Sequence, residues 1–305
     1  MPSPASPASP RRVPLVIAAL AVGVLTAACG ASGASDDVRD VPTKTTRKPD
    51  GRPDLSGFPS ARTTGPKPGT QLRVVGETTV KKAGEVVEGV EIHGKLNIEA
   101  DDVVVRNVRV VGQGDWAIIQ RQGVSGADIS DVEIMGDGTT KVDTAVLNQG
   151  GQISVRRANI HTVSNGIVTD HGVIEDCYLH DFKEFPGDHV DAIQIGGSPM
   201  KGLSLTVRHN TVFNQVAETS AIIIGQDFSR THDVLIQNNL LAGGGYTIYG
   251  GEGKFGVPTD IRIVDNIFSR RFFPKGGSFG PVAYYTDKGK GNAFTGNIWE
   301  DGKPL

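Results

Sequence analysis

The sequence predicts an all-β fold, a single-stranded right-handed parallel β-helix of about nine coils, and three observations indicate it. Short apolar segments recur along the chain, a second series of strand-like segments follows the first, and the composition favours strands joined by turns. The chain has 305 residues, of which 40 are glycine, nearly twice the usual share and without the period of collagen. Val, Ile, Thr and Asn are abundant, whereas the 3 methionines and the scarcity of Leu, Lys and Glu runs argue against a helical bundle.

The first series of segments begins near residue 86 and ends near residue 299. Each segment has two apolar residues two positions apart, then polar residues, a pivot residue and a further apolar residue, as in VVVRNVRV and LTVRHNTV. The apolar residues alternate with the period of two that is typical of strands, not the longer period of a helix. The pivots recur about every 26 residues on average, the length of one coil of a parallel β-helix. The pivots are Val90, Val108, Val132, Ala158, Cys177, Asn210, Asn239, Asn266 and Asn297.

Asparagine occupies four successive pivots, from Asn210 to Asn297, and this predicts a hydrogen-bonded ladder. Equal positions on stacked parallel strands lie about 4.8 Å apart, so the amides can bond to one another and to the backbone of the turns. Cys177 occupies the same column. It is therefore predicted to be a buried small residue and not a reactive thiol.

The second series of segments, which includes DAIQIGG, SAIIIGQ and YTIYGGE, predicts an external groove. The third residue of each segment is expected to face the core, so the fourth faces outward. Aromatic faces pack on sugar rings and an amide binds hydroxyl groups, which makes Gln194, Tyr249 and Tyr285 candidate substrate-binding residues. The alternative is that a loop covers this strip. The outward residues are Ile119, Leu147, Val168, Gln194, Ile223, Tyr249 and Tyr285.

Residues 1–28 are predicted to be a signal peptide. Arg11 and Arg12 precede the apolar residues 13–28, a stretch shorter than the ~20 residues that span a bilayer. The sequence LTAACG around Cys29 resembles the lipobox of bacterial lipoproteins. This resemblance implies lipidation of Cys29 and export to the outer face of the cell membrane. Thr26 stands where the motif prefers Leu, so secretion without an anchor is the alternative.

Residues 29–56 are predicted to be a disordered tether, and residues 57–305 a single β-helix domain. The segment ASGASDDVRDVPTKTTRKPDGRP has almost no apolar residues, while the rest of the chain is long enough for one core. The net charge of −3 provides no basic surface for phosphates, so we expect no nucleic-acid partner. We expect a monomer that binds a polysaccharide and contacts the membrane through its anchor.

The densest group of reactive side chains lies in residues 183–194, KEFPGDHVDAIQ, within the longest gap between pivots. Insertions of this kind form loops in which function concentrates. The alignment places Glu218 about one strand spacing from His189, and a carboxylate orients an imidazole and raises its basicity. The candidate catalytic residues are His189, Asp191, Asp188 and Glu218. Lys183 is a further candidate for binding substrate, and the alternative for the whole group is a polar loop whose side chains satisfy one another.

Residues from about 57 to 305 resemble the secreted right-handed parallel β-helix proteins of the pectate-lyase-like superfamily, through the two series of repeats. The segment GFPSARTTGPKPGTQL is similar to the N-terminal segment of actinobacterial members. The resemblance implies the fold and an extracellular carbohydrate-active role. That superfamily includes polysaccharide lyases, glycoside hydrolases, epimerases and adhesins, so the resemblance does not select one activity.

Two degradative reactions fit the group of reactive side chains, and a lyase is slightly favoured over a hydrolase. In a lyase a base removes a carbon-bound proton beside a uronate carboxylate, and Asp188 and Asp191 are candidate ligands for Ca²⁺. In a hydrolase two carboxylates flank the scissile bond. HVDAIQ resembles the NTDG segment of polygalacturonases with Asp191 as the matching acid, but the paired aspartates of that family do not follow. The alternative is a non-catalytic glycan-binding or scaffold protein at the cell surface.

A second, weaker group of polar residues is expected where the same strands end, five residues of strand or about 17 Å from Asp191. We expect these residues to form turns, and binding of a distant sugar unit is the alternative. The group comprises Asp170, His171, Gln226, Asp227, Glu252 and Lys288.

Overall fold

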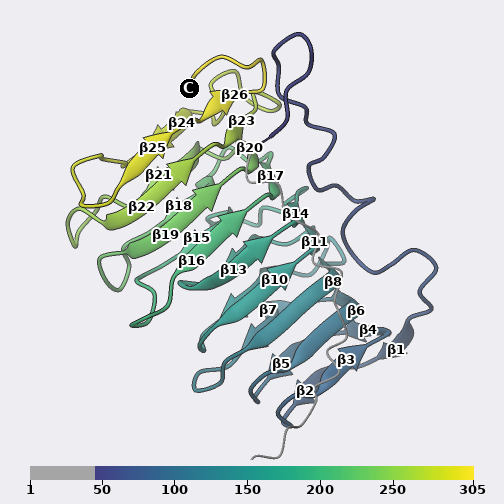
Figure 1. The fold of residues 1–305 in the computed structure, drawn as a ribbon. Helices are drawn as coiled ribbons and strands as arrows, with labels where there is room; N and C mark the ends of the chain where they lie inside the picture. Colours follow the sequence, from purple (N-terminus) through teal and green to yellow (C-terminus); the bar gives the residue numbers. More distant parts are fainter. Residues whose placement is uncertain (1–44) are drawn as a thin grey trace, which may run out of the picture. The chain divides into compact units, whose positions relative to one another are not determined.

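The computed structural model describes residues 45–305, which form 26 β-strands and no helix (Figure 1). Every pairing between these strands is parallel. The predicted all-β parallel β-helix is therefore confirmed. The predicted signal peptide and Cys29 lie outside the described residues. Within residues 45–305, no helix is long and apolar enough to cross a membrane.

The strands stack in three columns, which the chain visits in the same order in each coil. Columns A and B form one 17-stranded sheet because the long strands β6 and β8 run through both, and column C is a separate 9-stranded sheet. Column A holds β3 (Val86–Glu88), β6 (Val104–Val111), β8 (Ala127–Met135), β10 (Ile153–Arg156), β13 (Gly172–Glu175), β16 (Leu205–Arg208), β19 (His232–Gln237), β22 (Thr259–Val264) and β25 (Ala293–Thr295). Column B adds β1 (Arg73–Val75), β4 (Val90–His93), β11 (Asn159–His161), β14 (Tyr178–Leu179), β17 (Thr211–Asn214), β20 (Leu240–Gly243), β23 (Ile267–Phe268) and β26 (Ile298–Trp299). Column C holds β2 (Thr78–Val80), β5 (Leu96–Ile98), β7 (Gly114–Gln120), β9 (Val142–Asn148), β12 (Asn165–Val168), β15 (Asp191–Ile195), β18 (Ser220–Ile224), β21 (Tyr246–Gly250) and β24 (Gly280–Ala283).

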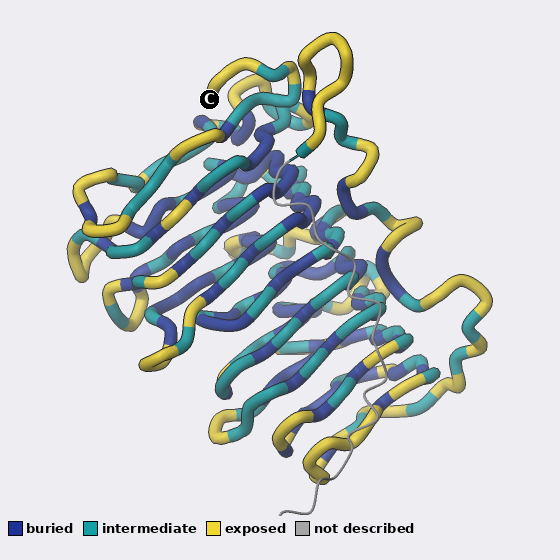
Figure 2. The backbone as a smooth tube through the Cα atoms, viewed as in Figure 1, coloured by how far each residue is buried: buried dark blue, intermediate teal, exposed yellow. Residues whose placement is uncertain are grey.

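The inward side chains of the three columns form one continuous core. In column C, Val146, Ile167, Ile193 and Ile222 are fully buried and pair in register on successive strands. Figure 2 shows the same pattern along the whole domain, with buried backbone in the strands and exposed backbone in the turns. The apolar repeat of the sequence is thus the repeat of the core.

The corner between columns A and B contains one residue of left-handed backbone in each coil, directly before the pivot. These residues have φ between 48° and 70° and are Gly89, Asn107, Asp131, Arg157, Asp176, His209, Asn238, Asp265 and Gly296. Gly, Asn, Asp and His tolerate this conformation better than other residues do. Arg157 is the exception, and two hydrogen bonds of 2.7 and 2.8 Å from its guanidinium to Asp131 of the preceding coil hold it there.

The predicted asparagine ladder is confirmed at this corner. The Nδ2 of Asn210 donates to Oδ1 of Asn239, and Asn239 donates in the same way to Asn266, both at 2.9 Å. The ladder continues from Asn266 to Asn297 at 3.0 Å. Cys177 stands at the head of the ladder, and the prediction that it is buried is confirmed. Burial raises the pKa of its thiol to about 12, which disfavours the reactive thiolate.

Residues 45–72 precede the first strand and lie along column B (Figure 1). Thr45 donates a hydrogen bond of 2.7 Å to Asn238, and Phe58 covers Leu240 and Ile267 on the outer face of the column. Residues 45–56 belong to the predicted tether, and the rest of that tether lies outside the described residues.

Candidate functional site

The candidate site lies on the outer face of column C, where β15 and β18 begin. Asp191 pairs in register with Ser220, which pairs with Tyr246 of β21. These residues occupy the first position of the aligned segments DAIQIGG, SAIIIGQ and YTIYGGE. The regular stacking of the strands therefore brings a carboxyl, a hydroxyl and a phenol together on three successive coils.

His189 and Glu218 form an exposed pair across two neighbouring coils. Nδ1 of His189 lies 2.8 Å from Oε1 of Glu218, and the imidazole is 80% exposed. The hydroxyl of Thr219 donates a hydrogen bond of 3.1 Å to the same carboxylate. The predicted juxtaposition of His189 and Glu218 is confirmed. Since the carboxylate holds Nδ1, Nε2 is directed away from Glu218 and can exchange a proton with a ligand.

Thr219 is a strained residue between two site residues. Its φ of 44° is unfavourable for a β-branched side chain. Its carbonyl accepts hydrogen bonds from the backbone of Gly245 and Tyr246, at 2.9 and 3.2 Å, which fixes this conformation. Strained backbone of this kind is concentrated at functional sites. Here it turns Glu218 toward His189 while Ser220 stays in the strand beside Asp191.

Asp191 is a buried carboxyl beside the exposed pair, with only 4% of its surface accessible. Ser220 donates a hydrogen bond of 2.5 Å to Oδ1, and the backbone N–H of Asp191 donates to Asn165. Burial raises the pKa of Asp191 to about 7, against the effects of Ser220 and His189, and the charge of Glu218 adds to the rise. A group with this pKa can donate or accept a proton at neutral pH.

Asp188 does not join this group, which corrects its expected place among the reactive side chains. Its Oδ1 forms an ion pair with Lys141, and its Oδ2 accepts hydrogen bonds from Ser164 at 2.7 Å and from the N–H of Phe185 at 3.1 Å. These bonds lower the pKa of Asp188 although burial opposes the shift. Asp188 therefore ties the loop to earlier coils through Lys141 and Ser164.

Lys183 lies at the start of the same loop and is exposed. Its ammonium lies 6.0 Å from the centroid of the Phe185 ring. Within residues 45–305, no group of three or more His, Cys, Asp or Glu side chains is arranged to hold a metal ion.

The register of the outward column is confirmed up to Tyr249, but Ile119 at its start is fully buried and the predicted position of Tyr285 is wrong. Gln194 pairs with Ile223, and Ile223 pairs with Tyr249, as the alignment requires. On the next coil Ala283 is the partner of Tyr249, two residues earlier than predicted. Tyr284 then adopts a φ of 52° at a bend in the chain, and Tyr285 packs against the core with its hydroxyl buried.

Sequence reasoning missed Ser220, which contacts Asp191 directly, and three aromatic residues on the next two coils of the same face, namely Tyr246, Phe279 and Tyr284. Ser220 and Tyr246 stand in the first position of the aligned segments, a column that was available in the sequence. Phe279 and Tyr284 flank the last strand of column C, and only their rings' contacts with Tyr246 and Tyr249 reveal them.

The second polar group, at the ends of the column C strands, contributes to turns as expected, and this is clearest for Asp170 and Gln226. Oδ1 of Asp170 accepts hydrogen bonds from the N–H groups of Gly196 and Gly197, at 2.9 and 3.0 Å. The amide of Gln226 binds the backbone of the turn on the next coil. These two side chains therefore hold successive turns together.

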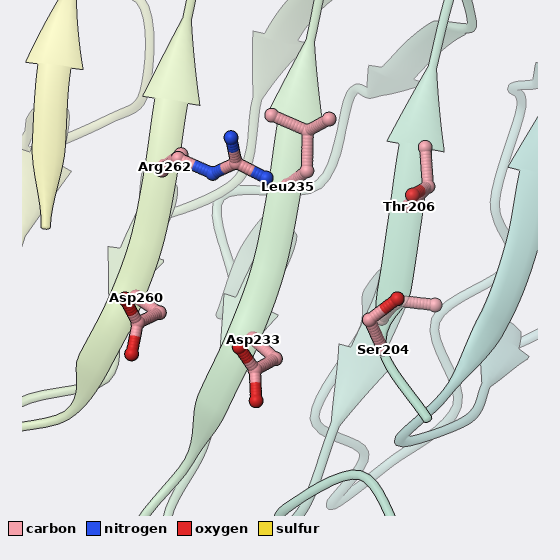
Figure 3. A pocket seen from close by; sticks show the side chains of 7 residues that line it. Ser204, Thr206, Asp233, Leu235, Asp260 and Arg262 are labelled. Carbon is pink, nitrogen blue, oxygen red and sulfur yellow. The ribbon is translucent and has the colours of Figure 1, made fainter. Parts of the chain in front are cut away.

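A shallow pocket of about 220 Å³ lies elsewhere, on the outer face of column A (Figure 3). Thr206, Leu235 and Arg262 line it from three successive strands, and Ser204, Asp233 and Asp260 lie at the starts of those strands. The pocket belongs to the other sheet, so it shares no strand with the candidate site.

Comparison of the chain with protein-family models, with curated proteins and with solved structures finds no match.

Proposed function

We propose that the protein is an extracellular polysaccharide-degrading enzyme whose acid–base groups are Asp191 and the His189–Glu218 pair. One observation carries this proposal: a buried carboxyl with a pKa of about 7 lies beside an exposed imidazole that a carboxylate holds from the next coil. General acid–base catalysis requires a proton donor and a proton acceptor whose pKa values are near the working pH. Thr219, whose backbone is strained, connects Glu218 to Ser220, the residue that binds Asp191, and this strain supports a functional role.

The same groups serve either of two reactions. In a lyase, Nε2 of His189 accepts the proton from the carbon beside a uronate carboxylate, and Asp191 donates its proton to the departing glycosidic oxygen. In a hydrolase, Asp191 again protonates the departing oxygen, and Glu218 or His189 accepts a proton from the attacking water. Elimination leaves an unsaturated sugar and hydrolysis leaves a saturated one, so the products identify the reaction.

The proposal is tested by assaying the purified protein on a polysaccharide panel, with ultraviolet absorbance for unsaturated ends and a reducing-end assay for hydrolysis. We expect Asp191→Asn and His189→Ala to lower kcat/KM by about 10²- to 10⁴-fold. We also expect wild-type activity to fall as the pH rises above about 7, because Asp191 then loses its proton. His232→Ala is the matched control, since His232 also pairs with a carboxylate, Asp233 at 2.8 Å, but on column A. Wild-type rates in both site variants would refute the assignment.

A non-catalytic glycan-binding protein is the second candidate, and the aromatic residues beside the site favour it. Phe279 and Tyr284 expose 64% and 63% of their surface there. Exposed aromatic side chains at a polar site are typical of sugar binding. Binding of a polysaccharide with no change in its length would select this candidate.

The proposal also includes export of the protein from the cell. The apolar leader and the resemblance of LTAACG to a lipobox support a lipoprotein anchored through Cys29, with secretion as the alternative. The parallel columns support a relationship to the pectate-lyase-like superfamily, and right-handed winding is the expected hand for parallel crossover connections.

A further inference from the structure

Four aromatic rings form a continuous row on the outer face of column C. The ring of Phe279 lies 5.8 Å from that of Tyr246, Tyr246 lies 5.5 Å from Tyr249, and Tyr249 lies 5.7 Å from Tyr284. Tyr246 and Tyr249 stand on β21, and the other two flank β24. The row, called the ring row below, therefore runs along the strand direction and crosses the axis along which the coils stack.

The ends of the ring row are held in place although they bury little surface. Tyr284 has a φ of 52°, an unfavourable conformation for a bulky side chain, and yet it is 63% exposed. Its ring stacks on Tyr249 with an interplanar angle of 14°. Burial of the Tyr284 ring is too small to offset the free-energy cost of its strained backbone. Strain of this kind is typical of a residue that is positioned for a ligand.

The surroundings of the ring row are acidic. Burial, the neighbouring tyrosines and the carboxylates of Asp191 and Glu218 all raise the pKa of Tyr249. Cations lie over aromatic rings at several other places in the described part of the chain, for example Lys95 and Arg121 over Trp116 and Lys254 over Phe255. Within residues 45–305, none lies over a member of the ring row.

We propose that the ring row binds a chain of uncharged pyranose units that lies along the strands, with Asp191 and the His189–Glu218 pair at its side. Flat aromatic faces pack on the apolar faces of sugar rings. Glu218 repels a carboxylate-bearing sugar, and within residues 45–305 no lysine or arginine lies over the rings to offset that repulsion. This inference rests on the proposed function, because it takes the same face as the substrate site, and of the two reactions it selects hydrolysis of a neutral polysaccharide.

The test compares binding of neutral and acidic polysaccharides to the whole chain by affinity electrophoresis. Galactan, mannan and mixed-linkage glucan are the neutral probes, and polygalacturonate and alginate are the acidic ones. We expect at least one neutral probe to bind, with little dependence on salt, and the acidic probes to bind more weakly. Phe279→Ala and Tyr284→Ala should each weaken binding of the neutral probe by about tenfold. Phe228→Ala is the matched control, because Phe228 is 80% exposed but lies outside the ring row.

Several results would overturn the inference. One is that no neutral probe binds, another is that only the acidic probes bind, and a third is that the two ring-row variants bind as the wild type does. Binding to lipid vesicles, or self-association, that the same variants abolish would assign the ring row to a membrane or to a second copy instead. Binding of a neutral probe without cleavage would leave the ring row's role as a binding surface standing but refute the selection of hydrolysis and the enzymatic proposal, so the two failures are distinguishable.

Discussion

The corner between columns A and B and the outer face of column C are built from the same repeat, but they use it differently. At the corner each coil repeats one solution, a left-handed residue followed by a buried pivot. From Asn210 to Asn266 each pivot amide bonds to the next pivot and to the backbone, and the amide of Asn297 bonds to the backbone. The pivot amides at this corner are therefore paired with the neighbouring coils and with the backbone.

On the outer face of column C, successive coils differ. The first positions of β15, β18 and β21 are Asp191, Ser220 and Tyr246, and strained residues stand at Thr219 and Tyr284. The carboxyl of Asp191 accepts a hydrogen bond from one side chain, that of Ser220, although an ionised carboxylate can accept several hydrogen bonds. The regular corner is thus a rigid support, whereas the departures from regularity on the other column position the acid–base groups of the proposed function.

The largest effect on stability is expected from breaking the corner. Asn239→Leu removes the acceptor of both the N–H and the Nδ2 of Asn210, and it removes a donor to Val207. A stranded buried polar group costs about 1 to 3 kcal/mol, so we expect a loss of about 2 to 6 kcal/mol in the free energy of unfolding by urea. Gln237→Leu, on the outward side of the same coil, should change it by about 0.5 kcal/mol or less. Equal losses in the two variants would contradict the role of the ladder.

The sequence predicts the corner well because every coil repeats the same residue types at the same position. Asn239 and Asn266 can be identified as ladder members without any structure, since strand spacing alone brings them together. His189 and Glu218 were likewise found from the register of two neighbouring coils. Contacts between adjacent coils are therefore within reach of sequence reasoning wherever the register is regular.

The sequence fails where the chain leaves the repeat. The left-handed conformation of Tyr284 cannot be read from a YY pair, and it moves Tyr285 from the surface to the core. The partner of Asp188 is Lys141, which lies 47 residues earlier in the loop of another coil. Loops of unequal length have no common register, so pairs of this kind are found only by folding the chain.

A smaller, pH-dependent effect is expected at Asp191. In the folded protein its pKa of about 7 lies above the ordinary value of 3.8, so the folded state binds more protons between these pH values. This contribution to stability is therefore present below about pH 4 and is lost as the pH rises through 7. Asp191→Asn keeps an acceptor for Ser220 but cannot ionise, so it should gain stability relative to wild type as the pH rises, by on the order of 4 kcal/mol at most.

The measurement for Asp191 is the free energy of unfolding by urea at pH 4.5 and at pH 8. Asp188→Asn is the control of opposite sign, because the lowered pKa of Asp188 contributes stability that is present above its unfolded value. That variant should lose stability relative to wild type as the pH rises. If Asp191→Asn shows the same trend as Asp188→Asn, Asp191 is ionised at neutral pH and cannot serve as the acid.

The smallest effect on stability is expected at Tyr284. Two variants there distinguish the contribution of the strained backbone from that of the ring contact with Tyr249. Glycine adopts positive φ without penalty, whereas alanine retains the unfavourable contact of Cβ with the backbone, so Tyr284→Gly should be more stable than Tyr284→Ala by about 1 kcal/mol. Both variants lack the ring that stacks on Tyr249. They should therefore bind a neutral polysaccharide equally weakly while differing in melting temperature. If Tyr284→Gly binds as tightly as wild type, the backbone conformation of this turn matters for binding and the Tyr284 ring does not. The strained face would then differ from the regular corner in its backbone shape and not in the side chains that it offers to a ligand.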